Sequence, residues 1–149
     1  MSEPTLCSIG VMAYNEERNI GNLLKALCAQ ELDTVSIGEM VVVASGCTDN
    51  TCGVVEDEIL CDTRIRMLVQ EQREGKMSAI NLFLQNARHE VVVIINADVL
   101  READCIERLV GPFADPSVGI TGGRPVAINS RDSLPGFAAK MALPFWLNR

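Results

Sequence analysis

Short apolar runs alternate with amphipathic stretches along most of the chain, and this alternation limits the fold more than any other feature. Apolar runs predict strands at residues 5–14, 36–45, 64–70, 90–97 and 118–129. Helical spacing of apolar residues predicts helices at residues 15–30, 52–60, 75–88 and 101–114. This order indicates an α/β fold with an open, mostly parallel, Rossmann-like sheet, and right-handed crossovers would place helices on both faces of the sheet.

Three of these elements carry more detailed expectations. The run at 90–97 is apolar at consecutive positions, as expected of a parallel strand covered by helices on both sides. The helix at 15–30 would hold Glu16 and Glu17 in its first turn, where carboxylates suit the positive end of the helix dipole. The helix at 75–88 offers five apolar residues for burial, which are Met77, Ile80, Leu82, Leu84 and Ala87.

Length and composition narrow the class of protein. At 149 residues the chain has the size of one domain, and we expect a single domain over residues 1–149. A net charge of −7 argues against a nucleic-acid partner, because phosphate backbones are bound by basic surfaces. No signal peptide and no membrane-spanning run is recognisable, so we expect a cytoplasmic protein. Its six cysteines should then be reduced and mostly buried.

Polar residues gather where four of the predicted strands end. Ligands of open α/β sheets bind outside the carboxyl ends of the strands, so these clusters would share one edge. The first cluster is Tyr14-Asn15-Glu16, in which an aromatic ring beside a carboxylate suits a nucleobase. The plainer alternative, and the favoured one for this cluster alone, is that Asn15 caps the following helix.

The second cluster spans residues 44–51, "ASGCTDNT". Its small hydroxyl and amide groups could surround a ribose or a diphosphate. Equally, the segment could be an ordinary turn from strand to helix, with Thr48 or Asp49 as the helix cap. The sequence leaves both interpretations open.

The third cluster places Arg73 and Lys76 at the start of the helix predicted at 75–88. Two cations at that end oppose the helix dipole unless an anion neutralises them, and the free backbone N–H groups of a helix start also attract anions. The pair therefore predicts a phosphate site. Neither a P-loop nor a GxGxxG pattern is present, which argues against a dinucleotide oxidoreductase.

The fourth cluster is Asn96-Ala97-Asp98. A carboxylate at a strand tip suits a hard cation such as Mg²⁺ or Mn²⁺ that is bound partly through the phosphates of a ligand. Capping of the helix predicted at 101–114 is the plainer alternative. His89, between a predicted helix and strand, is interpreted as a solvated residue without a chemical role.

Taken in order, four motifs resemble one known family. "VMAYNEERNI", "VVVASGCTDNT", "REGKMSAIN" and "EVVVIINADVL" are similar to the nucleotide-binding half of the family 2 glycosyltransferases, which have the GT-A fold, over residues 6 to 124. The resemblance implies an inverting enzyme that takes its sugar from a nucleotide-diphospho-sugar, most often UDP- or GDP-linked.

The resemblance also implies roles for single residues. The nucleoside pocket would involve Ala13, Tyr14 and Glu16, whereas Arg73 and Lys76 would lie near the diphosphate or the base. Asp98 would coordinate Mg²⁺ or Mn²⁺, which neutralises charge on the leaving nucleoside diphosphate. We expect the donor to contact Ala13, Tyr14, Glu16, Ser45, Arg73, Lys76, Asn96 and Ala97.

The chain departs from the family pattern at three points. Ala44-Ser45 stands where acidic residues are common, which removes a carboxylate acceptor for the base or ribose. Asn96 replaces the first Asp of the DxD pattern, so metal affinity would rest mainly on Asp98. No Glu-Asp pair follows Asp98 as a general base. We therefore expect a donor-binding part in which residues 125–149 begin a missing acceptor half.

The C-terminal segment 134–149 is rich in apolar and aromatic residues, Phe137, Phe145 and Trp146 among them. Such a segment would pack under an acceptor half, rest on the cytoplasmic face of a membrane, or contact a second copy of the chain. The expected partners are therefore a nucleotide-diphospho-sugar, a membrane surface and a homo-oligomer.

Two other functional classes remain open at this point. A non-catalytic nucleotide-sugar-binding or scaffold module would retain the fold without turnover. A nucleotidyltransferase shares the alternating layout, but it would normally carry a glycine-rich, basic loop after the first strand, and "AYNEERN" is neither.

Overall fold

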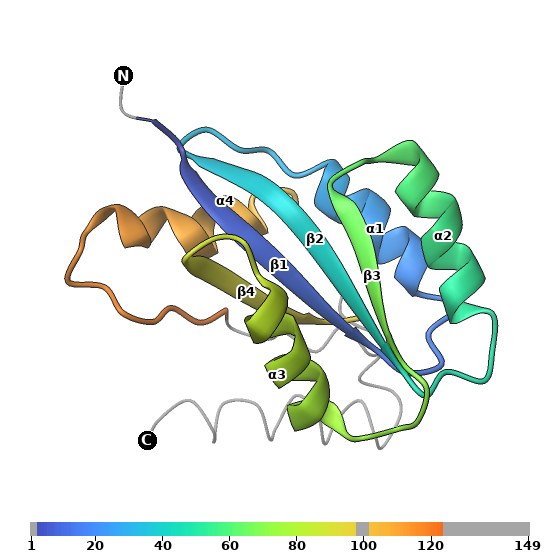
Figure 1. The fold of residues 1–149 in the computed structure, drawn as a ribbon. Helices are drawn as coiled ribbons and strands as arrows, with labels where there is room; N and C mark the ends of the chain where they lie inside the picture. Colours follow the sequence, from blue (N-terminus) through green and yellow to red (C-terminus); the bar gives the residue numbers. More distant parts are fainter. Residues whose placement is uncertain (1–2, 98–101, 124–149) are drawn as a thin grey trace, which may run out of the picture.

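The computed structural model describes residues 3–97 and 102–123, which form one parallel sheet with helices on both faces (Figure 1). The strands are β1 (Thr5–Ala13), β2 (Val35–Ser45), β3 (Ile65–Gln70) and β4 (Val91–Asn96). The helices are α1 (Ile20–Cys28), α2 (Thr51–Cys61), α3 (Lys76–Asn86) and α4 (Cys105–Val110), followed by the 3-10 helix η1 (Gly111–Ala114). The strand order is β3-β2-β1-β4, and all neighbours are parallel. The predicted α/β fold class is confirmed.

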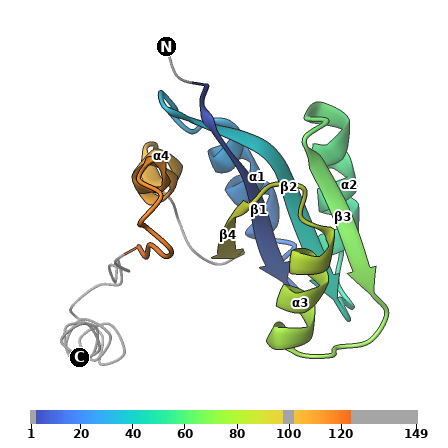
Figure 2. The ribbon, with the colours of Figure 1, turned by 60° about the vertical axis from the view of Figure 1, so that its left-hand side comes forward.

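Two apolar layers hold the sheet between its helices. One face packs against α1, α2 and α4, and the opposite face packs against α3 (Figure 2). Alternate residues of β1 divide between these layers, with Ile9 and Val11 in the larger core and Met12 beneath α3. Gly10 allows the fully buried ring of Phe83 to lie against the sheet, because a Cβ at this position would be 2.5 Å from the ring. The position of α3 therefore depends on this close contact.

A bulge in β2 decides which side chains face which layer. Cys7 pairs with Ile37 but Ser8 pairs with Glu39, so Gly38 is the extra residue. The one-residue shift turns Glu39 toward the α3 face of the sheet and returns Met40 to the larger core. A carboxylate that is only 2% exposed therefore lies inside the fold.

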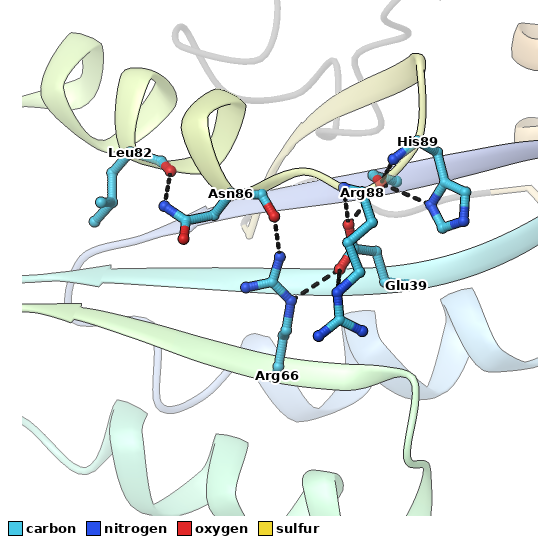
Figure 3. A network of polar contacts seen from close by, with 7 residues as sticks. Glu39, Arg66, Leu82, Asn86, Arg88 and His89 are labelled. Atoms are coloured by element: carbon cyan, nitrogen blue, oxygen red, sulfur yellow. Dashed lines mark hydrogen bonds and ion pairs between the residues drawn. The ribbon is translucent and has the colours of Figure 1, made fainter.

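Both oxygens of the buried Glu39 carboxylate accept hydrogen bonds (Figure 3). Glu39 Oε1 accepts hydrogen bonds from the Ser8 hydroxyl at 2.7 Å and from the backbone N–H of Arg88 at 2.7 Å, and Oε2 accepts one from Arg66 Nε at 2.8 Å. Arg66 also donates to the carbonyl oxygen of Asn86, the last residue of α3. The network thus fixes the connection from α3 to β4.

His89 belongs to the same network and is not the solvated residue that the sequence predicts. Its backbone N–H donates to the Ser8 hydroxyl, and its ring Nδ1 lies 3.0 Å from the same oxygen. The ring is half-buried and lies over Gly38, where a Cβ would be 2.3 Å from it. The β2 bulge, which the sequence does not reveal, creates this environment.

Several sequence-based expectations fail in detail. Helix α1 begins at Ile20, so Glu16 and Glu17 precede it instead of forming its first turn. Met77 and Leu84 are 69% and 46% exposed, and α3 buries Ala79 and Phe83 instead. Packing determines where a helix begins and which of its faces is buried. The periodicity of the sequence predicts both only approximately.

The edge of the sheet and the cysteines also differ from expectation. Among the residues described, β4 is an edge strand that is covered only in part: Val91 and Val93 pack against the larger core and Val92 against the α3 core, but Ile94 is exposed. All six cysteines are free, but Cys7 is the only fully buried one, whereas Cys28 and Cys61 are exposed. Cys28 donates to Asp62, and partial desolvation of the thiol together with this carboxylate raises its pKa to about 11.

Some expectations fall on residues that the structure does not describe. Residues 118–123 of the predicted fifth strand have no regular secondary structure, and residues 124–129 lie outside the described ranges. The apolar segment 134–149 also lies outside them. Within the described part of the chain, no helix is both long enough and apolar enough to cross a bilayer.

We predict that Glu39→Ala lowers the free energy of unfolding by about 3–5 kcal/mol. The substitution leaves the Arg66 guanidinium, the Arg88 backbone N–H and the buried Ser8 hydroxyl without their shared acceptor. Glu102→Ala is the matched control. Glu102 pairs with Arg108 at 3.3 Å but its side chain is 80% exposed, so its loss should cost less than about 1 kcal/mol. Urea denaturation at pH 7 measures both. Equal losses in the two variants would show that the Glu39 network does not stabilise the fold.

The same carboxylate should make stability depend on pH. Burial alone would raise the pKa of Glu39, but hydrogen bonds from Arg66, Ser8 and the Arg88 backbone outweigh it and lower the pKa below its ordinary value of 4.5. Its stabilising contribution is therefore complete above pH 4.5 and is lost as the pH falls through the lower folded-state value. Over this acid range the wild-type chain should lose more stability than Glu39→Gln, and parallel denaturation profiles would contradict the assignment.

Candidate functional site

A cleft of about 270 Å³ lies at the carboxyl ends of the strands, beside the start of α3. All eight residues that the sequence predicts to contact a donor line this cleft, namely Ala13, Tyr14, Glu16, Ser45, Arg73, Lys76, Asn96 and Ala97. Met12, Gly75 and Ala79 also line it, and sequence reasoning did not single them out. Asp98, the predicted metal ligand, directly follows Ala97 but lies outside the described residues.

Strand register explains why residues so far apart in the sequence share one cleft. Met12 pairs with Asn96 on β4, Ala13 pairs with Ala44 on β2, and Ser45 pairs with Gln70 on β3. Because all four strands are parallel, the first polar residue after each strand emerges at the same edge. Sequence reasoning missed Met12 on β1 and Ala79 on α3 because both are apolar residues of the layer between the sheet and α3, where the apolar pattern predicts only core.

Arg73 and Tyr14 form a stacked pair at the mouth of the cleft. The guanidinium carbon of Arg73 lies 4.0 Å from the centre of the Tyr14 ring, which is a cation–π contact. Gly46 makes this approach possible, since its φ is +61° and a Cβ there would lie 2.4 Å from the Arg73 backbone nitrogen. Tyr14 and Arg73 thus present a stacked pair of planar groups to the cleft, which Ser45 also lines.

The start of α3 supplies positive charge to the cleft. Gly75 occupies the N-cap position of α3 without a side-chain cap, and the first turn contains no acidic residue. Lys76 begins the helix, as the sequence predicts. Within the described ranges neither Arg73 nor Lys76 forms a salt bridge, while the nearby carboxylate of Glu74 bonds Gln70 and Ser78. The local field therefore favours an anion.

Residues 48–51 join two loops, and the N-cap position of α2 belongs to Asn50 instead of Thr48 or Asp49, the two caps that the sequence offered. The backbone N–H of Thr48 donates to Asn15 Oδ1 at 2.8 Å, and that of Glu17 donates to Asp49 Oδ2 at 3.1 Å. Asn15 itself is left-handed, with φ of 54°, and the N-cap position of α1 belongs to Asn19. The second cluster is thus a turn that holds the Tyr14–Glu17 loop in place, and within it only Ser45 lines the cleft.

Thr51 is the centre of this junction. It is fully buried, its hydroxyl accepts the backbone N–H of Glu16 at 2.8 Å, and it donates to Asp49. Burial would raise the pKa of Asp49, but the bonds from Thr51 and from the backbone N–H of Glu17 lower it overall. Glu16, which lines the cleft, is therefore positioned by a residue of α2.

Metal ligands are incomplete among the described residues. No three His, Cys, Asp or Glu side chains converge within residues 3–97 and 102–123. The plainer interpretation of Asp98, as a cap of the next helix, is not needed, because Asp104 occupies the N-cap position of α4. Glu16 is the carboxylate that lines the cleft, and it accepts a hydrogen bond from Asn19 Nδ2 at 2.8 Å.

Comparison with known proteins decides the family. The sequence profile of Glycosyl transferase family 2 matches residues 8–144, which is most of the chain. The chain belongs to glycosyl transferase family 2. The family predicted from the four motifs is thereby confirmed, and the match extends beyond residue 124, where the recognised motifs end.

Relatives of this family 2 chain are known in sequence and in structure. Glycosyltransferase GlyG of Streptococcus pneumoniae is 28% identical over 73% of the chain and 35% of its own length. A mannosyltransferase of Pyrobaculum calidifontis, solved with GDP-Man and Mn²⁺, superposes with a TM-score of 0.67 at 32% identity over 79% of this chain and 34% of that one. Glucosyl-3-phosphoglycerate synthase of Mycobacterium tuberculosis, solved with Mn²⁺, UDP and phosphoglyceric acid, gives a TM-score of 0.60 at 25% identity, covering 74% and 39%. The chain thus spans about a third of the length of these relatives.

We predict that Thr51→Val lowers the free energy of unfolding by about 1–3 kcal/mol, because the substitution keeps the shape but leaves the Glu16 N–H without an acceptor and removes one of the donors to the Asp49 carboxylate. Thr63→Val is the matched control at an exposed position, and it should change stability by less than about 0.5 kcal/mol. Urea denaturation measures both variants. A Thr51→Val loss no larger than the control would show that the hydroxyl does not hold the two loops together.

Proposed function

We propose that the chain carries the donor site of an inverting, metal-assisted glycosyltransferase that uses a UDP- or GDP-linked nucleotide-diphospho-sugar. One observation carries the proposal: the eight residues singled out by the sequence motifs all line one cleft at the carboxyl edge of the sheet. The relatives solved with GDP-Man or with UDP and Mn²⁺ support the class of ligand.

The charge distribution of the cleft supports a diphosphate. Arg73 and Lys76 lie at the start of α3, and the first residue of this helix and its N-cap Gly75 both line the cleft, where free backbone N–H groups favour an anion. In a chain with a net charge of −7, this local positive charge is unexpected unless it binds an anion. The flat Tyr14–Arg73 pair provides a surface on which a nucleobase can stack.

The residues at the tip of β4 fit a divalent cation that is held jointly with a ligand. Mg²⁺ and Mn²⁺ sites in nucleotide enzymes often use one or two carboxylates together with substrate phosphates, so a complete cage of protein ligands is not required. We assign Asp98 as the carboxylate ligand and the Asn96 amide as a neutral neighbour. When bound, the cation would supply charge neutralisation for the departing nucleoside diphosphate.

The alternative is a module of the same family that binds nucleotide-sugars without turnover. Titration calorimetry with UDP-glucose and GDP-mannose, each with and without Mn²⁺, separates a binding site from an inert scaffold. Release of free sugar or nucleoside diphosphate from the bound donor then separates an enzyme from a binding module. The donor-site proposal fails if neither nucleotide-sugar binds in the presence of Mn²⁺.

Asp98→Ala should abolish the gain in nucleotide affinity that Mn²⁺ produces, because no other carboxylate is assigned to the cation. The midpoint of thermal unfolding should stay nearly unchanged. Asp104→Ala, a nearby aspartate at the N-cap position of α4, should retain the Mn²⁺ effect. If Asp98→Ala instead unfolds at a much lower temperature, the residue supports the fold and the metal assignment is wrong.

A further inference from the structure

The segment that joins β3 to α3 contributes side chains to two different hollows of the surface (Figure 1). Arg73 and Lys76 line the cleft at the carboxyl edge, whereas Glu71 and Glu74 line a second groove. The two hollows have no lining residue in common. The segment therefore separates a cleft that carries cations from a groove that carries carboxylates.

The second groove has a volume of about 780 Å³, which lies in the range of small-molecule sites. One of its walls is a face of α3, on which Ser78, Asn81 and Gln85 follow one another at helical spacing. Val69 and Leu82 add an aliphatic surface. Asn81 and Gln85 are exposed to solvent, so their amides are free to turn toward a ligand.

The amide of Gln70 also lines the groove and is held in one orientation. Its Nε2 donates to Glu74 Oε2 at 3.1 Å and to Ser78 Oγ at 2.8 Å, and the Ser78 hydroxyl donates to the same carboxylate oxygen at 2.7 Å. Because a carboxylate only accepts, the amide nitrogen must face Glu74. Gln70 is only 9% exposed, and its Oε1 has no hydrogen-bond partner among the described residues. A ligand that donates an O–H or N–H to this atom would complete the pairing.

The chemistry of the lining disfavours several classes of ligand. No lysine or arginine lines the groove, and Glu71 and Glu74 would repel a phosphate or another anion. No three metal-ligating side chains converge within residues 3–97 and 102–123, so the groove does not resemble a metal site. A purely apolar ligand would bury the two carboxylates without partners, which is costly. The groove therefore suits a ligand that brings many hydrogen-bond donors and no negative charge.

A sugar meets these requirements better than an organic cation. Each sugar hydroxyl both donates and accepts, which complements carboxylates that accept and amides that do both. The aliphatic Val69 and Leu82 suit the C–H face of a pyranose ring. A polyamine would pair with the carboxylates, but it has no acceptor for the amide N–H groups of Asn81 and Gln85.

We propose that this second groove binds a neutral glycan chain beside the cleft. Its glycan role rests on the proposed function, because a transferase that extends or decorates a glycan works next to such a chain. Hydroxyls of the glycan donate to Gln70 Oε1 and to the carboxylates of Glu71 and Glu74, and they accept from the amides of α3. The groove thus holds the chain without touching the donor, since none of its residues lines the cleft.

The test follows the side-chain amide signals of the isotope-labelled 149-residue chain by nuclear magnetic resonance, without nucleotide, during titration with tetrasaccharides of glucose, mannose or N-acetylglucosamine. At least one tetrasaccharide should bind and shift the signals of Gln70, Asn81 and Gln85. Asn81→Ala should raise the Kd of that glycan about fivefold, because one hydrogen bond is lost. Asn22→Ala, at an exposed position of α1 on the other face of the sheet, should leave the Kd unchanged.

Spermine is the competing probe, and raising the salt concentration distinguishes the two ligands. A neutral glycan should keep its affinity in salt, whereas binding of a polyamine should weaken. The inference is overturned if no tetrasaccharide binds, if only spermine binds, or if Asn81→Ala binds the glycan as tightly as the wild-type chain. Binding of UDP with Mn²⁺ in the absence of any glycan binding would leave the donor site standing. Glycan binding without nucleotide binding would instead contradict the proposed function and leave the groove as a glycan site.

Discussion

The parallel alignment of the four strands is the constraint on which the rest of the structure depends. Each strand ends at the same edge, so residues separated by more than eighty positions in the sequence, such as Ala13 and Ala97, line one cleft. An antiparallel pairing of any strand would move its polar tip to the opposite edge. The site is therefore a consequence of connectivity, since the helical crossovers that allow parallel pairing also bring α3 and its cations to that edge.

Polar groups are fully paired at the amino edge of the sheet and incompletely paired at the carboxyl edge, and this difference separates groups that stabilise the fold from groups available for binding. At the amino edge, the Glu39 carboxylate is fully paired by Ser8, Arg66 and the Arg88 backbone, which fixes the end of α3 and the start of β4. At the carboxyl edge, the described residues leave Arg73 and Lys76 without a salt bridge and two buried oxygens without a hydrogen-bond partner. Buried polar groups whose hydrogen bonds are all made within the fold make it rigid. Buried polar groups without a hydrogen-bond partner mark places where a ligand can supply one. Helix α3 runs between the two edges, with Lys76 at the carboxyl edge and Asn86 at the Glu39 network.

The sequence predicts the four described strands, the fold class, the family and eight of the residues lining the cleft, because each depends on periodicity or on motifs at strand ends. It does not predict the bulge at Gly38, since a one-residue shift leaves no periodic signal, and the misjudged environment of His89 follows from that. Asn15 illustrates a second limit: the residue type suits an N-cap, but a hydrogen bond to Thr48, on another loop, determines its conformation. Met77 and Leu84 show a third, because apolar residues cover most of α3 and only packing selects the buried stripe.

Neutral residues at two strand tips change how the cleft can hold a metal. With Ser45 on β2 and Asn96 on β4 in place of acids, the described residues of the cleft carry two cations, Arg73 and Lys76, and one carboxylate, Glu16. Such a site attracts a diphosphate but repels a free cation. A divalent ion would therefore gain most of its ligands from the phosphates, and the nucleotide and the ion would each raise the affinity of the other by the same factor, as thermodynamic linkage requires. On the proposed function, an acid at the Asn96 position would weaken this coupling by binding the cation alone, whereas the neutral amide would leave the two ligands dependent on each other.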